Sequence, residues 1–294
     1  MTELLAQSPA GFAVIAFLFA LLIGSFLNVV IYRLPIMMFR EWQEQCEELQ
    51  QSDTPTLPEK PFNIIVPPST CPSCGTRIAA WQNIPVISYL VLRGRCAGCQ
   101  QKISARYPLV ELLTAVLAAI VALHFGFTPE ALMAIGLTFA LVAISLIDYD
   151  HQLIPDSIVL PLLWVGLGMS LLNGAVPGEA LFVPPETAII GAIAGYLSLW
   201  IVYQVFKLVT GKEGMGHGDF KLLAALGAWL GWQSLHLIIL LSAVVGAVFG
   251  IAMILFRGRD RQLPIPFGPY LAAAGWVTML WGADIWNAYL HNFV

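Results

Sequence analysis

Long apolar runs constrain this chain more than any other feature of its sequence. Several of them reach about the twenty residues that a helix needs to cross the hydrocarbon layer of a bilayer. They dominate the composition, because 58% of the 294 residues are hydrophobic and only 11% are charged. A soluble protein of this length is rarely so apolar, so the sequence predicts an all-α polytopic membrane protein.

The apolar runs predict about eight transmembrane helices. Their approximate bounds are 11–32, 108–126, 130–147, 157–172, 187–206, 222–238, 239–256 and 268–289. The sixth and seventh form one nearly continuous stretch, and we place the turn between them around Gly231 to His236. The chain then divides into a first transmembrane helix (1–32), a polar insert (33–107) and a transmembrane core (108–294). The first span lacks a small-residue cleavage site before a soluble domain, which favours an anchor over a removed signal peptide.

The basic residues indicate how these spans are oriented. All 14 lysines and arginines lie within 33–106, 207–221 and 257–261, which fall on one side of the predicted membrane. Loops that carry Lys and Arg remain in the cytoplasm. The polar insert is therefore expected to be cytoplasmic, and both termini are expected on the opposite side.

Four cysteines in the polar insert have the spacing of a metal site. They form two CxxC pairs about two dozen residues apart, namely Cys71 with Cys74 and Cys96 with Cys99. Two such pairs, on turns that contain Gly and Pro, can hold Zn²⁺ in a tetrahedron of thiolates. Disulfides and free thiols remain alternatives, although a reducing cytoplasm disfavours disulfides. With four thiolates the zinc site is predicted to be closed and structural, and it would let this small insert fold. Cys46 is interpreted as a simple thiol.

Aspartates at the cytoplasmic ends of the spans are the candidates for chemistry. Asp148 ends the third span in "LIDYDHQLIPD", and Asp219 opens the sixth in "GMGHGDFK". If the two carboxylates meet, they can share a proton, so that one activates a water and the other protonates a peptide carbonyl. The glycines Gly216 and Gly218 allow a peptide backbone to approach Asp219. The spacing alone leaves the meeting of the two acids open.

These acids also have structural interpretations. Asp150 fits a solvated loop, Asp156 after Pro155 fits a helix N-cap, and Asp219 could likewise cap the sixth span. Acids at the edge of a membrane are nevertheless functional candidates. A non-enzymatic assembly factor or transporter, with the acids along an ion path and the insert as a docking module, therefore stands beside an enzyme as an alternative.

Seven blocks of the sequence together resemble the type IV prepilin peptidases, which are relatives of the GxGD intramembrane aspartic proteases. In order, they are "GSFLNVVIYRLP", the CxxC…CxxC insert, "NIPVISYL", "RYPLVELL", "LIDYDHQLIPD", "GKEGMGHGDFKLLAALGAW" and "PIPFGPYLAAAGW". The resemblance implies that Asp148 and Asp219 are the catalytic pair of an aspartic endopeptidase. It implies substrates that are prepilins and pseudopilins, of type IV pili and type II secretion, whose short basic leader is cut after a glycine. It also implies a place in the bacterial inner membrane, with both termini periplasmic, the active site facing the cytoplasm and no nucleic-acid partner.

The large insert implies a second activity. Relatives with such an insert also methylate the new N-terminal amine with S-adenosylmethionine, and a peptidase that has lost methylation is the alternative. The sequence has no Rossmann-type glycine loop for this methyl donor. Three acids of the insert and its borders could meet a cationic sulfonium or amine: Glu41, Glu47 and Glu111. The alternative is that they are solvated or pair with Arg33, Arg40 or Arg106. Gly24 and Asn28 of the first span are interpreted as close helix packing with a polar tie.

Overall fold

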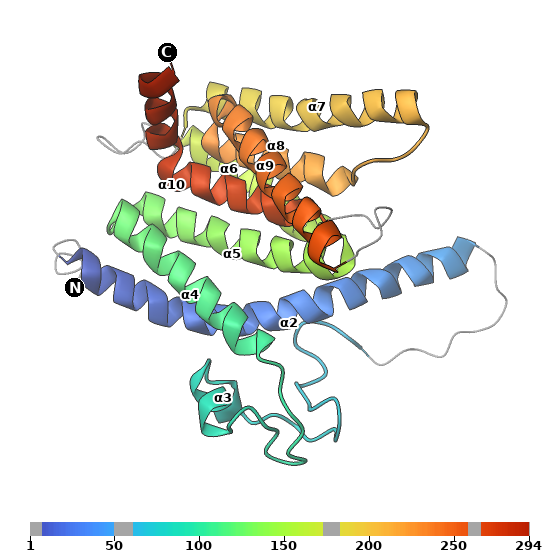
Figure 1. Cartoon of the computed structure of the whole chain (residues 1–294). Coiled ribbons are helices and arrows are strands. Elements are labelled where there is room, and N and C mark those ends of the chain that lie inside the picture. The colour runs from blue at the N-terminus through green and yellow to red at the C-terminus, as the bar shows by residue number, and fades with distance from the viewer. Residues whose placement is uncertain (1–7, 50–60, 173–182, 258–265, 294) are drawn as a thin grey trace. The chain divides into compact units, whose positions relative to one another are not determined.

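The computed structural model describes residues 8–49, 61–172, 183–257 and 266–293. The described residues are predominantly helical (Figure 1). Contacts divide the chain into two compact units, Met1–Phe127 and Thr128–Val294. The first unit contains α2 (Pro9–Leu49), η1 (Ala80–Asn83), α3 (Ile87–Val91) and α4 (Arg106–Phe125). The second contains α5 (Pro129–His151), α6 (Asp156–Leu171), α7 (Pro185–Thr210), α8 (His217–Leu230), α9 (Trp232–Arg257) and α10 (Gly268–Phe293).

The first unit is built on α2 and α4, which pack along each other. Gly24 permits their close approach, since a Cβ at this position would lie 2.8 Å from the Cα of Glu111. Four residues further along α2, the side-chain amide of Asn28 donates a hydrogen bond to the carbonyl oxygen of Tyr107 at 3.1 Å. Both observations confirm the predicted close packing with a polar tie. The contacts therefore place α4 in the same unit as α2. The predicted division of the chain at residues 32 and 107 is based on membrane topology, and it stays a prediction.

Helix α2 continues well beyond the predicted end of the first span at residue 32. It has 41 residues, and at 1.5 Å per residue it is about 60 Å long, roughly twice the thickness of a hydrocarbon layer. The residues after Pro35 are rich in Met, Glu and Gln, which favour a helix without making it apolar. The polar insert therefore begins as a direct extension of the first span.

Five of the described helices are long and apolar enough to cross a membrane, namely α2, α4, α5, α7 and α9. This supports a multi-pass membrane protein, while the number of spans stays a prediction. The turn expected around Gly231 is confirmed, because α8 ends at Leu230 and Gly231, with φ of +79°, is its C-cap. The boundary expected between residues 238 and 239 is wrong, because α9 runs unbroken from Trp232.

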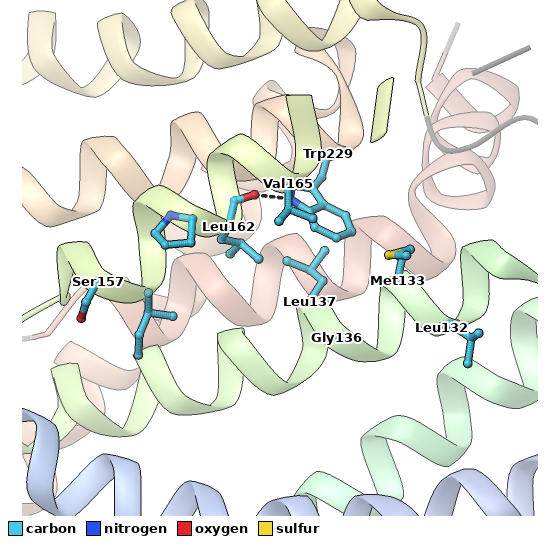
Figure 2. A pocket seen from close by; sticks show the side chains of 10 residues that line it. Leu132, Met133, Gly136, Leu137, Ser157, Leu162, Val165 and Trp229 are labelled. Carbon is cyan, nitrogen blue, oxygen red and sulfur yellow. Dashed lines mark hydrogen bonds between the residues drawn. The ribbon is translucent and has the colours of Figure 1, made fainter. Parts of the chain in front are cut away.

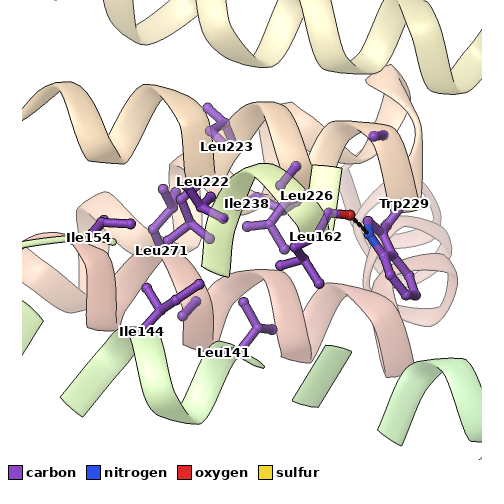
Figure 3. Close-up of a cluster of buried hydrophobic side chains, with 14 of the residues drawn as sticks. Leu141, Ile144, Ile154, Leu162, Leu222, Leu223, Leu226, Trp229, Ile238 and Leu271 are labelled. Carbon is purple, nitrogen blue, oxygen red and sulfur yellow. Dashed lines mark hydrogen bonds between the residues drawn. The ribbon is translucent and has the colours of Figure 1, made fainter. Parts of the chain in front are cut away.

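Helix α8 is the central helix of the second unit, and it contacts α6, α7, α9 and α10. Ten of its 14 residues are buried, and Figure 3 shows its leucines packed among side chains of the surrounding helices. A GxxxG pair on α7 brings the backbones together, since a Cβ at Gly195 would lie 2.6 Å from the carbonyl oxygen of Leu223. The first turn of α8, which carries Asp219, is therefore the end of a firmly packed helix.

Candidate functional site

Asp148 lies in the last turn of α5, and it is 6% exposed. The helix ends just beyond it, because Gln152 adopts a left-handed conformation and donates its N–H to the carbonyl oxygen of Asp148. The carboxylate Oδ2 of Asp148 accepts the backbone N–H of Gly268, the first residue of α10, at 2.9 Å. A Cβ at Gly268 would lie 2.7 Å from the same oxygen, so the contact requires glycine there.

Asp219 is the third residue of α8 and is also 6% exposed. Its backbone N–H donates to the carbonyl oxygen of Gly216, the N-cap residue, at 3.3 Å. Its carboxylate oxygen Oδ1 is buried and has no hydrogen-bond partner within the part of the chain that the structure describes. The interpretation of Asp219 as an N-cap is therefore wrong, and a buried oxygen without a donor is unusual enough to indicate function.

The structure brings the two acids into one neighbourhood through Ile154, in the link between α5 and α6. A Cβ at Gly218 would lie 2.7 Å from Ile154 Cβ, and a Cβ at Gly268 would lie 3.1 Å from Ile154 Cδ1. The same isoleucine thus packs against the glycine next to Asp219 and the glycine that binds Asp148. The two carboxylates are close enough to interact electrostatically.

The two glycines of the predicted catalytic loop differ in their surroundings. Gly218 is required by packing against Ile154, whereas a Cβ at Gly216 would meet only Asp219 Oδ2, at an ordinary 3.7 Å. Neither has a positive φ. Close packing therefore accounts for Gly218 but leaves open space beside Gly216, next to the Asp219 carboxylate.

The neighbouring polar residues have mainly structural surroundings. Asp150 is exposed, in agreement with a solvated residue. Asp156 does not cap α6, whose N-cap is Pro155. Its carboxylate instead forms an ion pair with Lys221 on α8, 2.7 Å from Nζ. The sequence could not indicate this pair, because it joins two helix starts that are far apart in the chain.

Sequence reasoning also missed the roles of Gly268 and Ile154. The available signal for Gly268 was its place before Pro269 in "PIPFGPYLAAAGW", since Gly-Pro suits the start of a helix. Ile154 offered no signal, because an isoleucine near a helix end is ordinary. Both act through contacts that only the folded chain makes.

The four predicted metal-binding cysteines gather into one cluster in the first unit. Their sulfur atoms all lie within 4.8 Å of one another, with Cys71 and Cys99 at 3.9 Å and Cys74 and Cys96 at 4.0 Å. A tetrahedral zinc site with metal–sulfur distances of about 2.3 Å has sulfur–sulfur edges of about 3.8 Å. The donor set therefore fits a metal held by four thiolates.

Two similar turns build this cluster. An isolated bridge closes each turn, joining Thr70 to Arg77 and Arg95 to Lys102. The residue after each CxxC pair has a positive φ, +70° at Gly75 and +59° at Gln100. Because both turns have this geometry, the two sulfur atoms of one CxxC pair face the two sulfur atoms of the other pair.

A hydrogen bond prepares one of the thiols for a metal. Cys74 Sγ lies 3.1 Å from the hydroxyl oxygen of Thr76. A hydroxyl that donates to the thiolate stabilises the charged form, and this lowers the pKa of Cys74 to about 6. Because metals bind thiolates and not thiols, Cys74 is ready to bind at neutral pH.

The three acids proposed for the second activity lie in different surroundings. Glu41 is exposed on the polar half of α2. Glu47 accepts a hydrogen bond from the amide of Gln43, one turn earlier. Glu111 on α4 is 8% exposed. Arg33 does not pair with any of them, because its guanidinium donates to the backbone carbonyls of Asn63, Ile64 and Pro67.

A separate apolar cavity of about 400 Å³ lies in the second unit (Figure 2). It is lined by Leu132, Met133, Gly136, Leu137, Ser157, Ile158, Pro161, Leu162, Val165 and Trp229. Trp229 borders it while donating its indole N–H to the carbonyl oxygen of Leu162 at 2.8 Å. The lining contains no acid, so the cavity is distinct from the Asp148 and Asp219 site.

Comparison with known proteins assigns both units. Residues 18–125 match the profile of the bacterial peptidase A24 N-terminal domain, and residues 135–251 match that of the type IV leader peptidase family. The chain is 55% identical to the prepilin leader peptidase/N-methyltransferase of Stutzerimonas stutzeri, over 98% of this chain and 97% of the relative. It is 54% identical to that of Aeromonas hydrophila, over 100% and 99%. It is 52% identical to that of Pseudomonas aeruginosa, over 99% and 97%. No solved structure matches.

Proposed function

Because this chain belongs to the type IV leader peptidase family, we propose that it cleaves the leader peptide from type IV prepilins and pseudopilins and then methylates the new N-terminus. The observation that carries the peptidase assignment is the pair of buried aspartates, Asp148 and Asp219, within the segment matched by the peptidase profile. The names of the relatives support the second activity. Their identities over nearly the whole chain favour an enzyme over an assembly factor or transporter.

The hydrogen bonds of the two acids suggest their roles in cleavage. Asp148 accepts the N–H of Gly268, and such a donor stabilises a carboxylate, so Asp148 is the general base. Asp219 also has a backbone donor, at Gly216, but its Oδ1 is buried without a donor among the described residues, which favours the protonated form, so Asp219 is the general acid. Two carboxyl groups that share one proton can divide the work in this way.

Cleavage then proceeds without a covalent intermediate. Asp148 takes a proton from a water, whose oxygen attacks the carbonyl carbon of the scissile peptide bond, while Asp219 donates its proton to the carbonyl oxygen. As the tetrahedral intermediate collapses, the C–N bond breaks and the leaving nitrogen takes the proton held by Asp148. A hydroxyl proton of the intermediate returns to Asp219. The open space beside Gly216 is where the substrate backbone approaches.

The substrate and the distribution of basic residues agree on where cleavage occurs. The protein lies in the bacterial inner membrane with its active site facing the cytoplasm and both termini periplasmic, as the positive-inside rule predicts. A prepilin presents a short basic leader on the cytoplasmic side ahead of an apolar helix. Its cleavage site therefore reaches the membrane at the level of the two aspartates.

The four cysteines hold a structural Zn²⁺. Four sulfur ligands leave no open position for a water, so the metal stabilises the insert and takes no part in the reaction. S-adenosylmethionine is the methyl donor for the second activity.

Substitution of each aspartate tests the peptidase assignment. In proteoliposomes that contain a prepilin, Asp148→Asn and Asp219→Asn should each slow cleavage by about 10²- to 10⁴-fold, because each removes a proton-transfer group. Asp150→Asn, at an exposed position two residues beyond Asp148, is the matched control and should cleave normally. Normal processing by either buried-site variant would contradict the assignment. A labelled methyl donor in the same assay tests the second activity, since a cleaved but unlabelled product excludes it.

A further inference from the structure

Glu111 is a buried carboxylate without a cationic partner in the described parts of the chain. It is 8% exposed, and it forms no ion pair with any residue that the structure describes. Its Oε2 accepts the backbone N–H of Val86 at 2.8 Å, and Ser25 is a neighbour of the same carboxyl group. Neutral donors compensate a buried negative charge only partly, so a cation has a strong electrostatic reason to bind here.

The surroundings of Glu111 also contain a hydroxyl and a carbonyl oxygen that can accept hydrogen bonds. The hydroxyl oxygen of Ser25 lies 3.5 Å from the carbonyl oxygen of Asn83. A carboxylate of α4, a hydroxyl of α2 and a carbonyl of η1 are therefore neighbours. A protonated amine has three N–H donors to satisfy, and this cluster provides three kinds of acceptor for them.

The turn that covers Glu111 is strained. Val86 has φ of +59° and ψ of −48°, which a β-branched residue rarely adopts. The N–H of Ile87 donates to the carbonyl oxygen of Pro85 across it, which makes a three-residue turn of the rare kind. Such conformations persist where the surroundings hold them and are concentrated at functional sites. Here the strained residue is the one that donates its N–H to Glu111.

We propose that Glu111, with Ser25 and the carbonyl of Asn83, binds the new N-terminal amine of the cleaved substrate and accepts a proton from it during methylation. This inference rests on the proposed methyltransferase function. The ammonium passes one proton to the Glu111 carboxylate, which frees the nitrogen lone pair. The lone pair forms a bond to the methyl carbon of the sulfonium donor, the carbon–sulfur bond breaks, and its electron pair stays on sulfur as a neutral thioether.

The location of this cluster supports a role apart from cleavage. Ser25, Asn83, Val86 and Glu111 all lie in the first unit, within residues 18–125 that match the bacterial N-terminal domain. Asp148 and Asp219 lie in the second unit, within the matched peptidase segment. Glu111 therefore lies in the matched N-terminal domain and not in the segment that carries the two aspartates.

The test compares Glu111→Gln with Glu41→Gln, which removes the same charge from an exposed site on α2. Each full-length variant receives a pre-cleaved pilin peptide and a labelled methyl donor, and binding of the peptide is measured against its N-acetylated form. We expect Glu111→Gln to lower methyl transfer by about 10²-fold or more and to lose the preference for the free amine. Glu41→Gln should match the parent in both measurements.

Two further measurements separate a chemical role from a structural one. Cleavage of an intact prepilin and bound zinc report on the fold of the two units, and both should persist in Glu111→Gln. Normal methylation by Glu111→Gln would overturn the proposal, as would a loss of methylation that is accompanied by loss of zinc. If the parent itself transfers no label, the methyltransferase function fails. If the parent also binds the free and the acetylated peptide equally, the proposed role of Glu111 in binding the amine is overturned as well.

Discussion

The two units each bury acid, but in different ways. In the first unit Glu111 has no second buried acid among the described residues, and it accepts the backbone N–H of Val86. In the second unit Asp148 and Asp219 lie in one neighbourhood, each with a backbone donor, and Asp219 Oδ1 has no hydrogen-bond partner among the described residues. A lone carboxylate can attract a cation and accept its proton. A pair can hold one proton and pass it back and forth, as hydrolysis requires.

This difference shows that burial alone does not define a catalytic acid. The donors around each carboxylate, and the presence or absence of a second acid, decide what it can do. Two chemically distinct sites in one chain agree with relatives whose names carry two activities.

The largest effect is expected from loss of a ligand in the metal cluster. It should impair the first unit while the second unit stays active. Cys71→Ser removes one of four ligands, and bound zinc should fall from about one per chain to nearly none, because structural zinc sites lose most of their binding free energy without a full ligand set. Val86 lies between the two CxxC pairs in the chain, so methyl transfer should fall as well, while cleavage should persist. Metal analysis and the two activity assays provide the measurements.

Cys46→Ser is the control for that experiment, because Cys46 is an exposed thiol on α2 outside the cluster. It should leave zinc and both activities unchanged. Acidification should also release the metal, because protons compete with it for the thiolates. If cleavage disappears together with the zinc, the two units do not act separately and the comparison fails.

An intermediate effect is expected from the two glycines that precede Asp219, Gly216 and Gly218. Gly218→Ala forces a Cβ to within 2.7 Å of Ile154 Cβ, and such overpacking costs about 1–3 kcal/mol in the free energy of unfolding. Gly216→Ala places its Cβ at an ordinary contact distance of 3.7 Å from Asp219 Oδ2, so its thermal stability should match the parent. Thermal unfolding in detergent measures both. A Gly216→Ala enzyme of normal stability but reduced cleavage would sharpen the assignment of that space to substrate.

The smallest effect is expected from the ion pair between Asp156 and Lys221. Its side chains are 53% and 30% exposed, so solvent screens it and Lys221→Met should cost only about 0.2–1 kcal/mol in stability. The pair joins the first turns of α6 and α8, near Asp219, and cleavage should weaken slightly. Exchanging the two charges, with Asp156→Lys and Lys221→Asp together, should restore the stability and the cleavage that either change alone loses. A large loss that the exchange does not restore would give Lys221 a different role.

Local patterns made part of this structure predictable. The apolar runs indicated the membrane helices, and the turn at Gly231 followed from its glycine. The metal cluster was predictable because two residues between cysteines suit one tight turn, and two such turns complete a tetrahedron. Asp148 and Asp219 were candidates because acids beside apolar runs are rare.

Contacts between distant segments were not predictable. Gly268 meets Asp148 across more than a hundred residues, and Lys221 reaches Asp156 from another helix. The first span gave no sign of continuing to Leu49, because its extension lacks the apolar character that marked its beginning. Val86 adopts a positive φ, which a β-branched residue disfavours, so the packing around Glu111 and not the local sequence accounts for this turn.

The most direct test of two acid sites with two activities gives a pre-cleaved pilin peptide to the Asp219→Asn variant. Cleavage is bypassed, so only the site at Glu111 is needed. We predict that this variant methylates the peptide at the rate of the parent, although it leaves an intact prepilin uncut. Loss of methyl transfer to the pre-cleaved peptide, in a variant that retains its zinc, would contradict the separation of the two sites.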